Sequence, residues 1–398
     1  MKKFRPAGLA AALLLSLLAA CGGGGDGPDA PEPSGAPETV GSFAALVSFG
    51  DSLSDLGTYQ PATSVSGDGQ PPFVGGKFTT NGAAATIFVQ NLAASLGLLA
   101  TPAEVGFNGQ SLKCPAALQN AALAATCTGY GQGGARVTSP AGIGRNADGS
   151  GALTVPVKTQ IANHLARFGG FKDSDLVLVF AGHNDVLVQF GAFATQAGAI
   201  QQQAATGQIT AQQAQAALLE AQVQAEAAVR QAALELTGYL RSDVLGRGAR
   251  YVAVLSLLDL TVTPFGRSLP DSARGVLAGL VSTFNDALPE GLDEAPVRIL
   301  DPNAPLRTAI QDPAAAGFAN VSVPACDPQK ISAITGGRVT DGSSLFCNAD
   351  ALPYNGLRAG ADANTWLFAD SVHPTTGGHK ALGDFVRARL QSFGWIAP

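Results

Sequence analysis

The chain has little charge and no cluster of basic residues. Only 14% of its 398 residues are charged, and 30 acidic residues outnumber 24 basic ones. Because nucleic-acid binding relies on clustered Lys and Arg that neutralise phosphates, this composition argues against a nucleic-acid partner. Histidine is scarce, with four residues, and no cluster of ligating side chains has the spacing of a metal site. The sequence therefore predicts an acidic protein that requires no metal and no other cofactor.

Long hydrophobic runs are lacking as well. The apolar stretch Leu9–Leu18 follows a basic start and is shorter than the roughly 20 residues that a transmembrane helix needs. Such a stretch is typical of a signal peptide for export. It ends in Leu18-Ala19-Ala20-Cys21, which resembles a bacterial lipobox. Residues 1–21 are therefore predicted to be a lipoprotein signal peptide with Cys21 as the lipidated residue, and the alternative is an ordinary secretory peptide that is cut nearby.

The segment that follows is poor in apolar side chains. Residues 22–41 are mostly Gly, Pro, Glu, Asp and Ser, a composition that cannot bury a core and predicts a flexible tether. Gly22, rather than Asp, follows Cys21. Resemblance to lipoprotein sorting signals then implies an outer-membrane anchor, with the protein periplasmic or at the cell surface, or secreted if Cys21 is not lipidated.

Cysteine is scarce too, with five residues in the chain. If Cys21 carries lipid, four remain, and export to an oxidising compartment favours disulfides. Four cysteines allow three pairings, and closeness in the sequence favours Cys114–Cys127 and Cys326–Cys347. Each bond would close a loop of roughly 15–20 residues, worth about 3 kcal/mol in the chain-entropy model. Metal ligation is the alternative, and the lack of Cys-x-x-Cys spacing or an adjacent His argues against it.

Short apolar runs alternate with stretches of helical spacing. The runs at residues 44–49, 175–180, 250–255 and 297–301 are predicted to be buried strands. Helices are expected at residues 82–97, 155–168, 210–242, 271–288 and 377–393. Continuous apolar strands that alternate with helices are typical of a parallel sheet covered on both faces. Residues 61–76 and 304–367 are rich in Gly and Pro and are expected to be long loops.

The segment 192–240 is unusual because it is rich in Ala and Gln and nearly free of aromatic residues. Its high helix propensity predicts an inserted pair of antiparallel helices that breaks around Thr206-Gly207. A structural hairpin is the favoured interpretation, and a lid that gates a site is the alternative.

Two short motifs near opposite ends of the chain point to chemistry. One is Phe49-Gly50-Asp51-Ser52-Leu53 and the other is Asp370-Ser371-Val372-His373-Pro374. A serine hydroxyl becomes a nucleophile when a base lies within hydrogen-bond reach and a third group orients that base. Asp370 and His373 stand on one short segment, so a single loop could bring both to Ser52. The pattern predicts a Ser–His–Asp triad in one domain that spans residues 42–398.

Two further motifs complete a resemblance to the SGNH hydrolase superfamily of GDSL esterases and lipases. Tyr130-Gly131-Gln132-Gly133-Gly134-Ala135-Arg136 is similar to the family's second block, and Gly182-His183-Asn184-Asp185 is similar to its third. The resemblance extends over about Leu46 to Phe393. It implies a three-layer α/β/α sandwich with a flavodoxin-like sheet of about five parallel strands. The Gly-x-Ser-x-Gly elbow of α/β-hydrolases is a different motif, so that fold is not expected.

The resemblance implies a role for each block. Ser52 would be the nucleophile, His373 the general base and acid, and Asp370 the group that orients His373. The backbone N–H groups of Ser52 and Gly133 and the side-chain amide of Asn184 would stabilise the oxyanion. Gly134 is the alternative to Gly133, which aligns best with the family's motif.

Other residues are assigned lesser roles. Asp51, Asp55 and Asp185 are expected to be structural, the last two through hydrogen bonds to loop N–H groups. His379 is expected on a helix face and His164 at the surface. The residues expected to line a substrate pocket are Phe73, His183, Trp366 and Phe368.

The sequence therefore predicts an exported serine esterase or lipase that hydrolyses small-molecule or lipid esters through an acyl-serine intermediate. A polysaccharide O-deacetylase and a lipid acyltransferase could use the same site. Outside enzymes, the alternative is a surface-binding lipoprotein with a relic site, and the presence of all five predicted site residues argues against it.

Overall fold

Four parallel strands form the central sheet of the computed structural model, which describes residues 42–63, 75–350 and 354–397. They are β1 (Ala45–Gly50), β4 (Asp175–Phe180), β5 (Tyr251–Leu255) and β6 (Val297–Leu300), in the order β1-β4-β5-β6. Ala45 lies opposite Asp175, and Leu176 lies opposite Tyr251. The four runs that the sequence predicts as strands are the four strands of this sheet.

The expected fifth strand is replaced by a single bridge on the outer side of β1. The Ser48 N–H donates to the Thr128 carbonyl (3.0 Å) and the Tyr130 N–H donates to the Ser48 carbonyl (2.8 Å). One further bond follows, in which the Gln132 N–H donates to the Gly50 carbonyl (3.2 Å), and the glycine-rich segment then turns, because the Ala135 N–H donates back to the Gln132 carbonyl (3.1 Å). The estimate of about five strands was therefore one too many, but the bridge still brings the second block beside β1.

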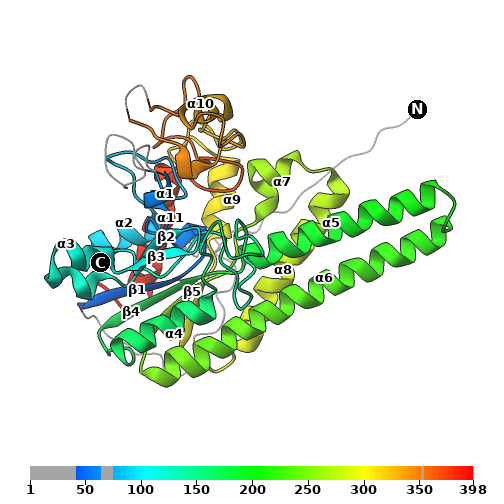
Figure 1. Cartoon of the computed structure of the whole chain (residues 1–398). Helices are drawn as coiled ribbons and strands as arrows, with labels where there is room; N and C mark the ends of the chain where they lie inside the picture. Colours follow the sequence, from blue (N-terminus) through cyan, green and yellow to red (C-terminus); the bar gives the residue numbers. More distant parts are fainter. Residues whose placement is uncertain (1–41, 64–74, 351–353, 398) are drawn as a thin grey trace, which may run out of the picture. The chain divides into compact units, whose positions relative to one another are not determined.

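The two faces of the sheet carry different side chains, because successive residues of a strand point to opposite sides. One face presents mostly valines, such as Val177 and Val252, to helices α4 (Val157–Phe168), α6 (Ala211–Tyr239) and α8 (Asp271–Gly291). The other presents larger side chains, such as Leu176 and Tyr251, to α2 (Phe88–Ser95) and α11 (Thr376–Ser392). Helices therefore cover both faces (Figure 1), which is the predicted three-layer arrangement.

Several shorter elements lie in segments expected to be loops. Helices α9 (Asn303–Gln311) and α10 (Pro328–Ile334) interrupt the predicted loop 304–367. Asp327 caps α10 and Pro328 stands in its first turn, so a Pro in this segment starts a helix. Other short α-helices and strands are α1 (Gln60–Thr63), the hairpin of β2 (Glu104–Phe107) and β3 (Gln110–Lys113), α3 (Pro115–Gln119) and α7 (Pro264–Ser268).

The expected helices α4, α8 and α11 begin and end close to their predicted limits, but α2 begins six residues later than residue 82. Gly82 has a φ of +135° and packs against Asp350, and Ile87 is still extended. These backbone conformations are not helical, so the helix starts only at Phe88.

The Ala- and Gln-rich segment forms two long helices, α5 (His183–Ala205) and α6. They are joined through Gly207, which has a φ of +73°, and the Thr210 side chain caps α6 by accepting from the Gln213 N–H (3.2 Å). The base of the pair packs on α8, and its far end reaches past α8 (Figure 1). The two helices and their break lie where the sequence predicts them, although α5 begins earlier, within the third block.

Both expected disulfides, Cys114–Cys127 and Cys326–Cys347, are present. The predicted signal peptide, Cys21, the tether and Phe73 lie outside the described residues. The described residues belong to one compact unit. None of the helices within these residues is long and apolar enough to cross a membrane.

His164 was expected at the surface and is instead in the core. It is 2% exposed, and its ring stacks on Phe171 at 4.3 Å between centroids, with Phe49 and Tyr130 at its edges. Burial lowers the pKa of His164 to about 4. The amphipathic pattern of α4 did not reveal this, because Phe49, Tyr130 and Phe171 come from other segments.

This buried imidazole should make the protein less stable in acid. The folded protein keeps His164 neutral, whereas the unfolded chain binds a proton near pH 6.5, so stability is lost as the pH falls below that value. At about 1.4 kcal/mol per pKa unit, the loss should be about 2–3 kcal/mol between pH 7.5 and 4.5.

Asp55 produces the opposite slope in the same range, because its pKa is raised to about 6. The measurement is therefore the difference between the wild type and His164→Phe. The unfolding free energy of each protein is measured by urea unfolding at pH 7.5 and at pH 4.5. Between these two pH values, the variant should lose about 2–3 kcal/mol less unfolding free energy than the wild type. Equal pH dependence in the two proteins would contradict the assignment.

Candidate active site

The structure brings Ser52, His373 and Asp370 together. Ser52 opens a 3₁₀ turn, Ser52–Ser54, directly after β1, and the other two residues lie in the loop before α11. The Ser52 Oγ is 2.8 Å from His373 Nε2, and His373 Nδ1 is 2.8 Å from Asp370 Oδ2. A proton on Nδ1 faces the carboxylate and leaves the Nε2 lone pair for the serine hydroxyl. This is the order of contacts that activation of a serine requires.

Asp370 is surrounded by hydrogen-bond donors. Its Oδ1 accepts from the N–H groups of Val372 (3.0 Å) and His373 (2.8 Å), and its Oδ2 accepts from the Ser344 N–H (3.0 Å). Burial alone would raise the pKa of Asp370, but His373 and these donors outweigh burial and hold it well below its ordinary value. Asp370 is therefore charged over the ordinary pH range and can stabilise a protonated His373.

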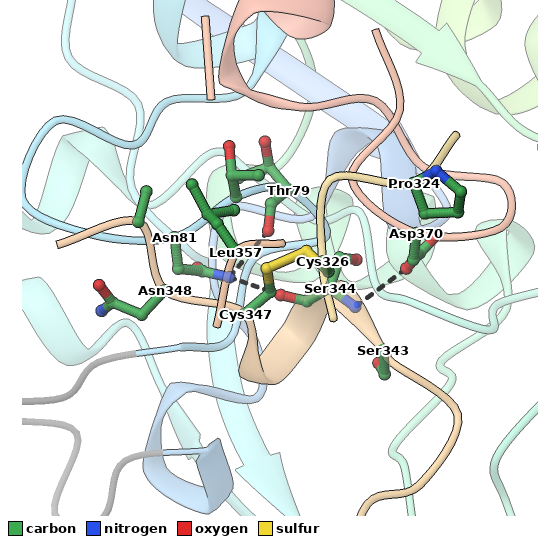
Figure 2. The surroundings of a disulfide bond; sticks show 12 residues. Thr79, Asn81, Pro324, Cys326, Ser343, Ser344, Cys347, Asn348, Leu357 and Asp370 are labelled. Atoms are coloured by element: carbon green, nitrogen blue, oxygen red, sulfur yellow. Dashed lines mark hydrogen bonds between the residues drawn. A yellow bond between two sulfur atoms is a disulfide. The ribbon is translucent and has the colours of Figure 1, made fainter. Parts of the chain in front are cut away.

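The Ser344 N–H reaches Asp370 because a disulfide holds its segment. Figure 2 shows the Cys326–Cys347 bond with Ser344 between Asn81 and Asp370. The Asn81 side-chain amide donates to the Ser344 carbonyl (2.8 Å), and the Cys326 N–H donates to the Ala369 carbonyl (2.9 Å). Both cysteines are thus tied to the segments that surround Asp370, a link that the sequence did not reveal.

The three predicted oxyanion donors differ in their present partners. In the described part of the chain, the Ser52 N–H forms no hydrogen bond. The Asn184 side-chain amide donates one hydrogen to the Ala135 carbonyl (2.9 Å), which leaves its second hydrogen. The Gly133 N–H, however, donates to Asp55 Oδ2 at 2.8 Å. Gly134 has no acceptor for its N–H among the described residues, so the geometry favours Gly134 over Gly133, and the assignment stays a prediction.

Asp55 connects the first block with the second. Its Oδ1 accepts from the N–H groups of Gly57 (2.9 Å) and Thr58 (2.7 Å), while its Oδ2 accepts from Gly133. Burial raises the pKa of Asp55 to about 6, against the opposing effect of these hydrogen bonds. Asp185 in turn connects the third block with the segment after the second block, because it accepts from the Val137 N–H (2.9 Å). Both aspartates hold loops, as the sequence predicts.

A second Asp–His pair lies directly beside the nucleophile. His183 Nδ1 is 3.1 Å from Asp51 Oδ2, and both side chains are buried. The Leu258 N–H donates to His183 Nε2 (3.1 Å), so this nitrogen carries no proton and Nδ1 donates to Asp51. Because its Nε2 lone pair is already used, His183 is not placed to act as the base for Ser52.

His183 instead joins three parts of the site. Asp51 precedes Ser52 and also accepts from the Leu53 N–H (3.1 Å), which fixes the turn that presents the nucleophile. His183 precedes Asn184, and Leu258 follows β5. The sequence predicted only that His183 lines a pocket. It does line the cavity, and it also sets the distance between the first and third blocks.

We expect His183→Ala to lower kcat by about tenfold to a hundredfold, less than the 100- to 1000-fold cost of deleting an oxyanion donor. His183→Gln should recover most of this loss, because an amide can accept from the Leu258 N–H and donate to Asp51. KM should change little in either variant. The test is a comparison of kcat and KM for both variants at equal folded fraction. Full kcat in His183→Ala would contradict this role.

His379 lies on a helix face, as expected, and this face of α11 is completely buried against other segments. Its Nδ1 accepts from the Phe88 N–H (3.3 Å) and its Nε2 lies 3.2 Å from the Phe78 carbonyl. Burial lowers the pKa of His379 to about 3. The Phe78 ring lies 4.7 Å from the His373 ring, so His379 supports the wall behind the base.

Ser52 and His373 open onto a cavity of about 860 Å³. Of the residues expected in a pocket, His183 and Phe368 line this cavity. Trp366 does not, and this expectation is corrected: its side chain packs against the cluster around the Cys326–Cys347 disulfide. Most of the lining is apolar, and it comes from α9, from α11 and from loops in several parts of the chain, with Phe107 from the β2–β3 hairpin. The start of α5 contributes His183, Asn184 and Leu187 to the lining, whereas no lining residue comes from residues 188–257, so within the described chain the Ala- and Gln-rich part of the helical pair does not border the cavity.

No group of three or more His, Cys, Asp or Glu within the described ranges is arranged to hold a metal ion. Comparison with curated proteins gives no match. The model of the GDSL-like Lipase/Acylhydrolase family matches residues 46–386, which is most of the chain and includes Ser52, Asn184 and His373. The chain therefore belongs to the GDSL-like lipase/acylhydrolase family of the SGNH hydrolase superfamily.

Proposed function

We propose that this hydrolase cleaves carboxylic esters through a covalent acyl-serine intermediate on Ser52. The observation that carries the proposal is the continuous contact from Ser52 Oγ through His373 to Asp370, at the wall of a large apolar cavity. Family membership supports hydrolysis, and the contact supports a serine nucleophile.

In the first half of the reaction, His373 Nε2 takes the Ser52 proton as Oγ bonds to the ester carbonyl carbon. The N–H of Ser52 and the amide of Asn184, with Gly134 or Gly133, donate to the oxyanion. The carbonyl then re-forms, the ester C–O bond breaks, and His373 gives its proton to the leaving alcohol. In the second half, water repeats the sequence and releases the acid, so one ester and one water yield one acid and one alcohol.

The cavity favours esters of apolar acids over polysaccharide acetates. Its lining contains leucines, prolines and phenylalanines, and a sugar chain would need many hydrogen-bonding partners that these side chains do not supply. Acyl transfer to a second alcohol uses the same acyl-serine, and a new ester formed in the presence of an added alcohol would reveal it.

Export is part of the proposal. The lipobox-like Leu18-Ala19-Ala20-Cys21 and the two disulfides support an exported protein anchored through Cys21 in the outer membrane. Incorporation of labelled palmitate in the producing cells, lost in Cys21→Ala, tests the anchor, and equal labelling of the variant would refute it.

The activity test uses the purified protein with p-nitrophenyl esters from C2 to C16 and a fluorophosphonate that reacts with activated serines. Ester hydrolysis should occur, and peptide mass spectrometry should locate the phosphonate on Ser52. Absence of both hydrolysis and adduct in folded protein with intact disulfides would refute the proposal.

A further inference from the structure

The cavity at Ser52 is lined by two separate hydrophobic clusters. The first wall consists of Tyr59, Phe78, Ala152 and Leu345, which pack together around Leu153. The second wall consists of Leu306, Ala309, Phe318, Leu367 and Phe368. Members of both walls border the same cavity as Ser52 and His373, so the apolar surface of the site has two independent parts.

Both walls reach the reacting groups. In the first wall, the Phe78 ring lies 4.7 Å from the His373 ring. In the second wall, Phe368 forms a backbone bridge with Pro374, the residue after His373. The Ala369 N–H also donates to the His373 carbonyl (2.8 Å), which fixes this wall to the base. An ester bound at Ser52 therefore has apolar surface from two different parts of the fold beside it.

The size of the cavity exceeds the needs of one short acyl group. Its volume of about 860 Å³ lies near the upper end of the range of about 300–1,000 Å³ that is usual for ligand sites. An acetyl group would leave most of this apolar surface in contact with water. Each further methylene buried there would favour binding by about fourfold.

Charge is almost absent from the lining. Among the described lining residues, Arg338 and Asp341 are the only acidic or basic side chains besides the histidines His183 and His373. Both are exposed and have opposite charge, and the Arg338 Nε already donates to the Thr335 carbonyl (3.0 Å). A phosphate-bearing alcohol would require fixed cations close to it. The lining instead fits a neutral substrate.

We propose that the site takes neutral esters with an apolar chain on each side of the ester bond, one wall holding the acyl chain and the other the alcohol. The proposal rests on the ester hydrolysis proposed above and adds that the alcohol half is recognised by its apolar surface.

Two ester series separate the halves of the substrate: ethyl esters of acids with increasing chain length, and acetate esters of alcohols with increasing chain length. Hydrolysis is followed by acid release. Phe107→Asp places a charge beside Tyr59, whose ring Phe107 contacts at 6.3 Å, and Leu306→Asp places one in the second wall. Leu219→Asp is the matched control, because Leu219 is 63% exposed on α6 and does not line the cavity.

In the wild type and the control, kcat/KM should rise at least tenfold from C2 to C8 in both series. In each wall variant, kcat/KM for the longest ester should fall at least tenfold in one series only. The two variants should affect different series. Three results would overturn the two-wall assignment. The wild-type kcat/KM could stay constant across the alcohol series, both wall variants could lose kcat/KM in the same series, or the wall variants could behave like Leu219→Asp. The Phe107→Ala and Leu306→Ala variants replace any Asp variant that does not fold.

Hydrolysis of p-nitrophenyl acetate provides the separate check on the proposed function. This short ester should be cleaved by the wild type and by Leu219→Asp. If it is cleaved and the wall effects are absent, only the two-wall proposal fails. If the wild type cleaves no ester at all, ester hydrolysis itself is refuted.

Discussion

Ser52→Ala should lower kcat for ester hydrolysis by about 10⁴-fold or more, with little change in thermal stability. The reason is that Ser52 Oγ is the hydroxyl held 2.8 Å from His373 Nε2, beside the cavity. Without it, the acyl group has no oxygen to which it can be transferred. Residual catalysis would come only from the oxyanion donors and from substrate binding.

Ser54→Ala is a matched control for this variant. Ser54 lies on the same 3₁₀ turn and is also buried, but it does not line the cavity. It should retain most of the wild-type kcat. Steady-state kinetics with p-nitrophenyl butyrate and a thermal melt of each protein provide the test. More than about 1% of the wild-type kcat in Ser52→Ala would exclude Ser52 as the nucleophile.

Removing the Cys326–Cys347 disulfide should cost both stability and activity. Closing a loop between cysteines 21 residues apart is worth about 3 kcal/mol of unfolding free energy. The same bond holds the segment whose Ser344 N–H donates to Asp370 (3.0 Å). In Cys326→Ala/Cys347→Ala we therefore expect kcat to fall at least tenfold at a temperature where the variant is still folded.

The other disulfide separates these two effects. Cys114–Cys127 spans 13 residues and should also contribute about 3 kcal/mol, but it packs with Ala116 and Leu123, away from the triad. Cys114→Ala/Cys127→Ala should therefore lose similar stability and keep most of its kcat. The kcat of the two double variants is compared at equal folded fraction. An equal loss in both would show that the contact between the Cys326–Cys347 segment and Asp370 does not contribute to kcat.

Features with a local signal were predictable from the sequence. Each strand is a short apolar run, and Ser52, Asn184 and His373 stand in motifs at strand ends or helix starts. Parallel strands place such residues at one edge of a sheet. The break at Gly207 also has a local signal, because glycine takes the left-handed conformation that the turn requires.

Features that depend on distant partners were not predictable. The Asp51–His183 pair joins residues 132 positions apart, and the Gly133 N–H is engaged by Asp55, 78 positions away. His164 looked exposed because its own helix is amphipathic, whereas its burial comes from Phe49, Tyr130 and Phe171. Such pairings follow from the packing of the whole sheet, which no single stretch of sequence encodes.

The separation of the triad along the chain has a consequence for the biosynthesis of the protein. Ser52 and His373 lie 321 positions apart, one before the second strand of the sheet and the other before the last helix. At about 5–20 residues per second, a ribosome needs roughly 15–65 s to proceed from the codon of the nucleophile to that of the base. During this time every growing chain contains the serine without its base. The ester-cleaving site is therefore completed only when synthesis is almost finished, and prematurely terminated chains carry no working copy of it.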